Sequence, residues 1–468
     1  MTYLDHFKEL CKIPHGSGNT TLICDHLERF AKEHSLEYHR DEVNNIIIIK
    51  EASFGRENDE PVIIQGHMDM VAVKDDDIDK DMKTEGLDVE TDGDFMYAKG
   101  TSLGGDDGIA VAYALALLES DMSLPRIEAV FTVDEEVGME GATAIDVSPL
   151  KGHTFLNVDS EEEGEFLVSC AGGARVDLSY DCNHEPRVNP APGNAVYEIS
   201  ISDFIGGHSG TEIDKNRANA IRIMCKILKK LFDAGVLLGI GDFSGGTADN
   251  AICASAKSVA LCKPIEPELF DMIKYEAMDR YMQTEKNAKI SYKTSDLQIP
   301  FYQAGDFLHF LTSLPDGVVA MSKDIEGLVE TSLNHGIISM ENGVVKLSLS
   351  IRSNIDSEKE NLKKTIKELV DNRPVKMNVH GDYPGWAYRE NSPIRDKMVN
   401  TYREMYGKEP IVKALHAGLE CGIFASKIPD LDCVSFGPNI YDIHTTREHL
   451  SLSSAERTWD FIVKILSK

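Results

Sequence analysis

Residues 62–70 read VIIQGHMDM, an apolar run that ends in a histidine and an aspartate. Short, continuously apolar runs are typical of strands that are buried on both faces of a sheet. Side chains two residues apart on a strand point to the same side, so His67 and Asp69 are expected to address one place. The run therefore predicts a buried strand with two chemically active side chains near its carboxyl end.

Neighbouring segments continue this pattern along the chain. GIAVAYALALLE (108–119) is predicted to be a helix that is apolar nearly all round, and IEAVFTVDEE (127–136) and TFLNVDS (154–160) are predicted strands. Apolar strands that alternate with a buried helix predict an α/β domain, with a mostly parallel sheet and helices on both faces. Sheets of this kind bind their ligands along the carboxyl ends of the strands.

The sequence changes character near Gly172, where polar and apolar residues begin to alternate as in half-buried antiparallel strands. Helical patterns accompany these strands at 214–234, 266–283 and 358–372. The first pattern returns later, with a predicted helix at about 394–406 and the apolar run LDCVSFGPNI. We therefore predict that residues 1–173 and 386–468 are two parts of one domain, and that 174–385 form an inserted α+β domain. A chain of 468 residues is long enough for two cores.

The composition excludes several classes of function. A formal net charge of −30 argues against nucleic acid or an anionic membrane surface as the partner. No run approaches the roughly twenty apolar residues of a membrane span, and the N-terminus lacks the pattern of a signal peptide. The nine cysteines are scattered without a CxxC pair, which predicts reduced thiols in a cytoplasmic protein and no thiolate zinc site.

Residues that can bind metals gather at the predicted strand ends and at one helix start. They are His67, Asp69, Asp106, Glu135, Glu136, Asp159 and His444. Taken singly, each has an ordinary explanation: a histidine at a strand end is more often structural, and Asp106 could cap a helix. Together, they come from five separate segments that converge on one edge of the predicted sheet. We therefore predict a shared site at that edge.

The residue types indicate the chemistry of this site. Histidine and carboxylate ligands without cysteine suit zinc, with manganese or cobalt as alternatives. Two histidines with three or more carboxylates would fit two ions that share a bridging carboxylate, about 3.5–4 Å apart. Adjacent strand residues point to opposite sides, so one of Glu135 and Glu136 is expected to bind metal while the other acts as a base. Such a centre suits hydrolysis of an amide bond.

Five motifs carry a resemblance to a known family. GHMDM, GTSLGGDDG, VDEEVGMEGA, NVDSEEEGE and GPNIYDIH resemble the successive metal-site motifs of the M20 metallopeptidases. Within that family the chain is similar to the branch of Xaa-His dipeptidases, also called aminoacyl-histidine or PepD-like dipeptidases. The resemblance runs in the same order over essentially the whole chain.

The resemblance implies five metal ligands: His67 and Asp159 on one metal, Glu136 and His444 on the other, and Asp106 bridging both. It also implies that Asp69 orients the imidazole of His67, and that Glu135 is the general base that activates a metal-bridging water. His449 lies five residues beyond His444 and is interpreted as a surface or supporting residue.

The resemblance further implies that the inserted domain is a lid over the site. His208 and Asn250 would contact the oxyanion, and Arg352 would bind the terminal carboxylate of the substrate. Glu420, in HAGLECG, is a candidate contact for substrate.

Alternatives remain open at this point. The expected activity is the hydrolysis of unblocked dipeptides, including Xaa-His dipeptides. A related enzyme of the same architecture could instead be an N-acyl-amino-acid deacylase or a tripeptidase. A non-catalytic relative that binds peptide or metal is disfavoured by Glu135, because a binding protein needs no base beside its ligands. Both a monomer and a homodimer are compatible with the sequence.

Overall fold

The computed structural model describes residues 1–467, and the chain forms two compact units. The first unit comprises Met1–Cys170, Trp386–Ala414 and the chain from Leu419 on. The second unit comprises Ala171–Gly385 together with the short segment Leu415–Gly418. Among residues 1–467, no helix has the length and apolarity needed to cross a bilayer.

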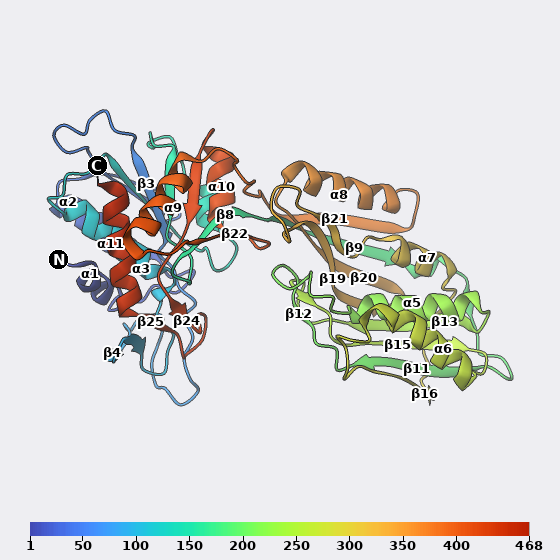
Figure 1. Cartoon of the computed structure of the whole chain (residues 1–468). Coiled ribbons are helices and arrows are strands. Elements are labelled where there is room, and N and C mark those ends of the chain that lie inside the picture. Colours follow the sequence, from blue (N-terminus) through green and yellow to red (C-terminus); the bar gives the residue numbers. More distant parts are fainter. Residues whose placement is uncertain (468) are drawn as a thin grey trace. The chain divides into compact units, whose positions relative to one another are not determined.

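The first unit is built on an eight-stranded sheet in the order β1-β2-β6-β3-β7-β23-β8-β22 (Figure 1). Its strands are β1 (Glu37–Arg40), β2 (Ile46–Lys50), β3 (Val62–His67), β6 (Ile127–Thr132), β7 (Thr154–Asn157), β8 (Glu165–Cys170), β22 (Ile411–Leu415) and β23 (Asp432–Ser435). The four central strands β6, β3, β7 and β23 are parallel, and antiparallel strands flank them. The predicted α/β sheet is therefore confirmed.

Helices cover both faces of this sheet. They are α1 (Tyr3–Leu10), α2 (Thr21–Glu33), α3 (Gly105–Glu119), α4 (Glu140–Ala144), α9 (Pro393–Tyr406), α10 (Glu420–Lys427) and α11 (Leu452–Leu466). Every residue of β3 and β6 is buried, which explains why these strands are apolar without alternation. On one face Ile64 packs in a core with α3, whereas on the other Phe155 contacts Phe424 of α10 at 5.0 Å between ring centroids.

A small antiparallel sheet also belongs to the first unit, in the order β24-β25-β5-β4. Its strands are β4 (Val89–Asp92), β5 (Phe95–Ala98), β24 (Ile440–Tyr441) and β25 (His449–Ser451). The connection between β24 and β25 carries His444, whose backbone is left-handed with φ 61°. This hairpin is what presents His444.

The second unit contains an eleven-stranded sheet whose described pairings are antiparallel. Its long strands are β9 (Gly172–Asp181), β11 (Ala195–Ser202), β13 (Leu237–Gly245), β15 (Ala256–Cys262), β16 (Lys289–Ser295), β19 (Val329–Glu341), β20 (Val344–Ser353) and β21 (Val375–Tyr383). Its helices are α5 (Ala220–Asp233), α6 (Pro267–Met278), α7 (Gly305–Ser313) and α8 (Asp356–Val370), and α5 is strongly amphipathic. A separate ribbon pairs β12 (Gly207–His208) with β14 (Ala251–Ile252).

Several predicted element bounds were wrong. The strand expected at 127–136 ends at Thr132, so Glu135 and Glu136 lie in a turn rather than on a strand. The helix expected from residue 214 begins at Ala220, because the side chain of Asn219 accepts the first free backbone N–H groups and starts the helix there.

Candidate active site

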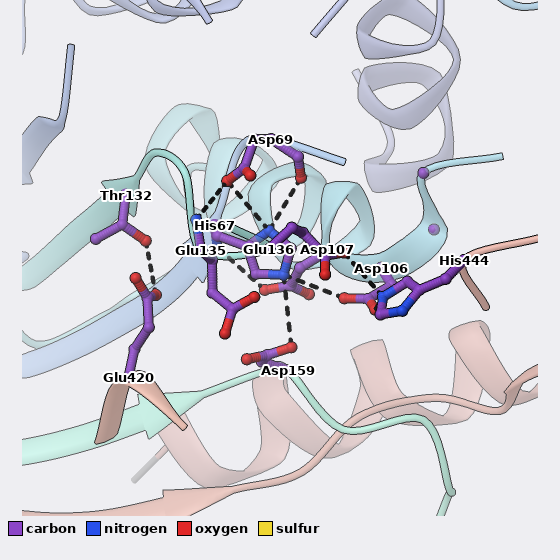
Figure 2. Close-up of polar contacts among 12 residues, drawn as sticks. His67, Asp69, Asp106, Asp107, Thr132, Glu135, Glu136, Asp159, Glu420 and His444 are labelled. Carbon is purple, nitrogen blue, oxygen red and sulfur yellow. Dashed lines mark hydrogen bonds and ion pairs between the residues drawn. The ribbon is translucent and has the colours of Figure 1, made fainter. Parts of the chain in front are cut away.

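The predicted ligands converge at the carboxyl ends of the central strands (Figure 2). Ligand atoms from three groups lie within 4.8 Å of one another: His67 with Asp106 and Asp159, His67 with Glu135 and Glu136, and Asp106 with Glu136 and His444. The groups share members, so they form one continuous cluster rather than three sites. Histidine nitrogen and carboxylate oxygen are the ligand types of zinc and similar divalent metals.

Asp106 occupies the centre of this cluster. Its Oδ1 lies 3.1 Å from Nε2 of His67, and its Oδ2 lies 3.2 Å from Nε2 of His444. Oδ1 of Asp159 is also 3.7 Å from Nε2 of His67, and Oε1 of Glu136 is 2.9 Å from Nε2 of His444. Each oxygen of Asp106 therefore faces one histidine, and each histidine has one further carboxylate beside it, which is the arrangement of two ligand sets sharing a bridge.

Asp69 supports both His67 and Glu135. The Nδ1 of His67 lies 2.9 Å from the backbone carbonyl of Asp69 and 3.6 Å from its carboxylate. The same carboxylate accepts the backbone N–H of Glu135 at 3.1 Å and the hydroxyl of Ser17 at 2.8 Å. With Nδ1 directed to this carbonyl, Nε2 of His67 is left to face the cluster. The contact with Glu135 was not anticipated from the sequence.

Asp107 holds the backbone of His67. Its Oδ2 accepts the backbone N–H of His67 at 3.2 Å. A Cβ at Gly66 would lie only 2.5 Å from that oxygen and 2.5 Å from Cβ of Ala110, so glycine is needed before the histidine. Burial, with the charge of Asp159, raises the pKa of Asp107 well above its usual range. The sequence showed this residue only as a neighbour of a ligand.

The charges of the cluster favour a bound cation. The adjacent carboxylates of Asp106 and Glu136 raise the pKa of His444 to about 10. Burial alone would lower the pKa of His67, but Asp106 and Asp159 outweigh it and raise that pKa well above its usual range. Glu136 Oε1 is buried and lies off the line of a hydrogen bond to His444, with no hydrogen-bond partner among residues 1–467. The residues present therefore fit metal ions.

Glu135 differs from its neighbour Glu136. Burial raises the pKa of Glu135 well above its usual range, and the charges of Asp159 and Glu420 add to this rise against the opposing charge of His67. A carboxylate with a raised pKa accepts a proton more readily. The position and the pKa of Glu135 therefore suit proton transfer beside the cluster.

Glu420, the first residue of α10, lies in a buried polar network. It is fully buried, and its Oε2 accepts hydrogen bonds from Thr132 at 2.7 Å and Gln65 at 2.5 Å. Burial raises its pKa to about 7. The other oxygen has no partner among residues 1–467. A contact with substrate stays a prediction for this residue.

Within the second unit, the ribbon of β12 and β14 brings His208 and Asn250 together. The backbone N–H of Ser209 donates to the carbonyl of Asn250 at 2.8 Å, and His208 pairs with Ala251. Nδ1 of His208 accepts backbone N–H bonds from Gly210 at 3.2 Å and Thr211 at 3.1 Å.

These two bonds determine the tautomer of His208. Backbone amides can only donate, so Nδ1 is an acceptor and the ring proton must be on Nε2. Burial and the nearby charge of Arg352 lower the pKa of His208, which keeps the ring neutral. His208 is therefore held as a neutral Nε2–H donor.

Arg352, on β20, is a buried cation whose charge has few hydrogen-bond partners. Its Nη1 donates to the hydroxyl of Tyr383 at 3.3 Å, whereas its Nε has no hydrogen-bond partner in the described chain. No carboxylate among residues 1–467 forms an ion pair with it, although it is only 8% exposed. A buried guanidinium without an anion is poorly satisfied, so it favours an incoming carboxylate.

Known proteins resemble this chain over nearly its whole length. A family model described as "Peptidase family M20/M25/M40" matches residues 63–468. The cytosol non-specific dipeptidase of Escherichia coli (strain K12) is 33% identical over 476 residues, covering 99% of this chain and 96% of that protein. The crystal structure of aminoacylhistidine dipeptidase from Vibrio alginolyticus matches with a TM-score of 0.93 at 32% identity, covering 99% of this chain and 96% of that one. Aminopeptidase PepT from Bacillus cereus shares the fold, with a TM-score of 0.57 at 17% identity over 99% of this chain and 97% of that one.

Proposed function

Since the chain belongs to peptidase family M20/M25/M40, as its motifs predicted, we propose that it hydrolyses unblocked dipeptides, including those that end in histidine. It is a metallopeptidase of the dipeptidase type. The names of its two full-length relatives, a non-specific dipeptidase and an aminoacylhistidine dipeptidase, support this substrate class. The observation that carries the proposal is the pair of ligand sets that share Asp106, with the carboxyl group of Glu135 beside them.

Two divalent metals would be held by the converging residues. The proposed ligands are His67 and Asp159 for one metal, Glu136 and His444 for the other, and Asp106 for both. Zinc suits this donor set, and manganese or cobalt are alternatives. When bound, two such metals lower the pKa of water and polarise the carbonyl of the scissile amide.

The proton transfers are assigned to Glu135. An amide is cleaved when water loses a proton on attack and the leaving amine gains one, so a single carboxyl group can serve both steps. The raised pKa of Glu135 suits it to hold that proton in between. Asp69 fixes the backbone of Glu135 and thereby its place beside His67.

The second unit is proposed to be the lid that completes the site. The Nε2–H of His208 would donate to the oxyanion that forms on the scissile carbonyl, with Asn250 beside it on the same ribbon. Arg352 would bind the terminal carboxylate of the dipeptide, for which its buried and unpaired guanidinium is suited. A lid that recognises this carboxylate would select short, free peptides.

The relative named as a cytosol enzyme supports a cytoplasmic location, as do the cysteines, all nine of which are free and buried. A dipeptide is the proposed partner of the site, and the net charge of −30 disfavours nucleic acid.

A substrate panel tests the proposed function against its alternatives. Free dipeptides, Xaa-His dipeptides among them, should release amino acids much faster than tripeptides or N-acyl amino acids at equal concentration. Amino-acid analysis of each digest in the presence of zinc or manganese measures this difference. Faster release from N-acyl amino acids would identify a deacylase, and faster release from tripeptides would identify a tripeptidase.

Substitution of Arg352 should reveal recognition of the substrate carboxylate. Arg352→Ala is expected to lower kcat/KM for a dipeptide on the order of 10–100-fold, the scale of one lost charge-assisted hydrogen bond. It should have far less effect on the matching dipeptide amide, which lacks that charge. Steady-state kinetics on both substrates provide the measurement, with the exposed Arg187→Ala of the same unit as control. Equal losses on both substrates would make Arg352 a structural residue.

A further inference from the structure

Glu448 is a buried carboxylate that binds four consecutive backbone N–H groups. Its Oε2 accepts from Leu103 at 2.7 Å and from Gly104 at 3.0 Å, and its Oε1 accepts from Gly105 at 2.7 Å and from Asp106 at 3.3 Å. The residue is only 3% exposed. Both oxygens therefore serve two donors each, and the carboxylate closes the loop that leads into α3.

The segment that leads into the regular part of α3 is held by this distant side chain. Asp106 and Asp107 have non-helical backbone, so the regular helix begins after them and the four N–H groups belong to the irregular segment before it. Gly104, at the start of this segment, has no side chain that could accept these bonds instead. Hydrogen bonds from N–H groups to a charged carboxylate are stronger than those to a neutral acceptor. A Cβ at Gly105 would lie 3.2 Å from Oε1 of Glu448, so the glycine permits the close approach.

The same carboxylate connects two residues of the metal cluster. One of its four donors is the backbone N–H of Asp106, the residue whose oxygens face His67 and His444. Glu448 also follows His444 by four residues, and its own N–H donates to the carbonyl of Thr445 at 3.2 Å. One side chain therefore fixes the loop of Asp106 against the loop of His444.

We propose that Glu448 is a positioning residue of the metal centre, setting the separation of Asp106 and His444 that the second metal requires. The inference rests on the proposed function only in taking these two residues as ligands. Glutamine in place of Glu448 would keep the shape, but its amide nitrogen cannot accept hydrogen bonds from the two N–H groups that it would face. Asp106 would then lose its fixed distance from His444.

Glu128 offers a matched control in the same unit. It is fully buried on β6, and it accepts backbone N–H bonds from Lys151 and Gly152 as well as a bond from Arg126. It lies near the amino end of its strand, whereas the metal cluster lies beyond the carboxyl ends. Glu128→Gln should therefore disturb a buried carboxylate of the same kind without moving a ligand.

The test is a titration of the metal-free full chain with Co²⁺, followed by visible absorption and by equilibrium dialysis. Glu448→Gln is expected to weaken binding of one of two Co²⁺ ions on the order of 10–100-fold, the scale for a lost supporting partner, and to change the absorption spectrum. Glu128→Gln should bind both ions as the wild type does. Activity of Glu448→Gln should recover at higher metal concentration.

A shorter carboxylate keeps the test decisive if Glu448→Gln does not fold. Glu448→Asp retains the negative charge, but its side chain is one methylene shorter and its carboxylate lies farther from the four N–H groups. It should lose less Co²⁺ affinity than Glu448→Gln in the same titration. Wild-type affinity and spectrum in whichever variant folds, or equal losses in the Glu128 control, would overturn the proposal. A wild type that binds two Co²⁺ ions but cleaves no dipeptide would refute the proposed function and leave this test valid, whereas a wild type that binds none would refute both.

Discussion

Replacement of Glu135 by glutamine is expected to lower kcat by about 10²–10⁴, the usual effect of losing a general base, while both metals remain bound. Glutamine has nearly the same shape but cannot take a proton from water. The contact between Asp69 and Glu135 uses only the backbone, so it should survive the substitution. Steady-state kinetics with a free dipeptide and metal analysis of the purified variant measure the two effects separately.

The neighbouring Glu136→Gln variant is the control for this result. Glu136 lies 2.9 Å from His444 and in the same ligand group as Asp106. Its loss should therefore lower metal content as well as turnover. If the two variants lost metal equally, the assignment of Glu135 as base and Glu136 as ligand would be wrong.

Removal of metal should abolish hydrolysis altogether. A strong chelator is expected to reduce dipeptide cleavage to background, because without metal the amide carbonyl and the attacking water both stay unactivated. Zinc, manganese or cobalt should restore activity, whereas magnesium should restore little, since it prefers oxygen ligands to histidine. The rate of amino-acid release before chelation, after chelation and after each addition gives the result.

Chelation must be separated from unfolding to interpret this experiment. Circular dichroism of the chelated protein should retain the signal of the native chain, because both cores are built without the cluster residues. Full hydrolysis by a preparation shown to contain no metal would contradict the proposed mechanism.

Strand prediction succeeded for the central strands β3 and β6 because every one of their residues is buried. Every residue of β3 is buried, so the run at 62–70 is mostly apolar without alternation, and this local pattern is visible without any knowledge of its neighbours. Element ends were less predictable. Glu135 and Glu136 follow an apolar strand, but the left-handed backbone of Asp134 turns the chain before them, and no local pattern reveals that turn.

The sequence by itself determined the fold class, the family and the set of residues that can bind metal, because each depends on residue types in short, ordered motifs. Only the tertiary structure decided how these residues act together. Glu448 and Asp106 are 342 positions apart, and their contact exists only because the hairpin of β24 and β25 folds beside the start of α3. The same holds for the hydrogen bonds of Asp107 to the backbone of His67 and of Asp69 to the backbone of Glu135. Such hydrogen bonds need donor and acceptor about 3 Å apart, to within a few tenths of an ångström, on segments that are remote in sequence. Composition and periodicity contain no information about those distances.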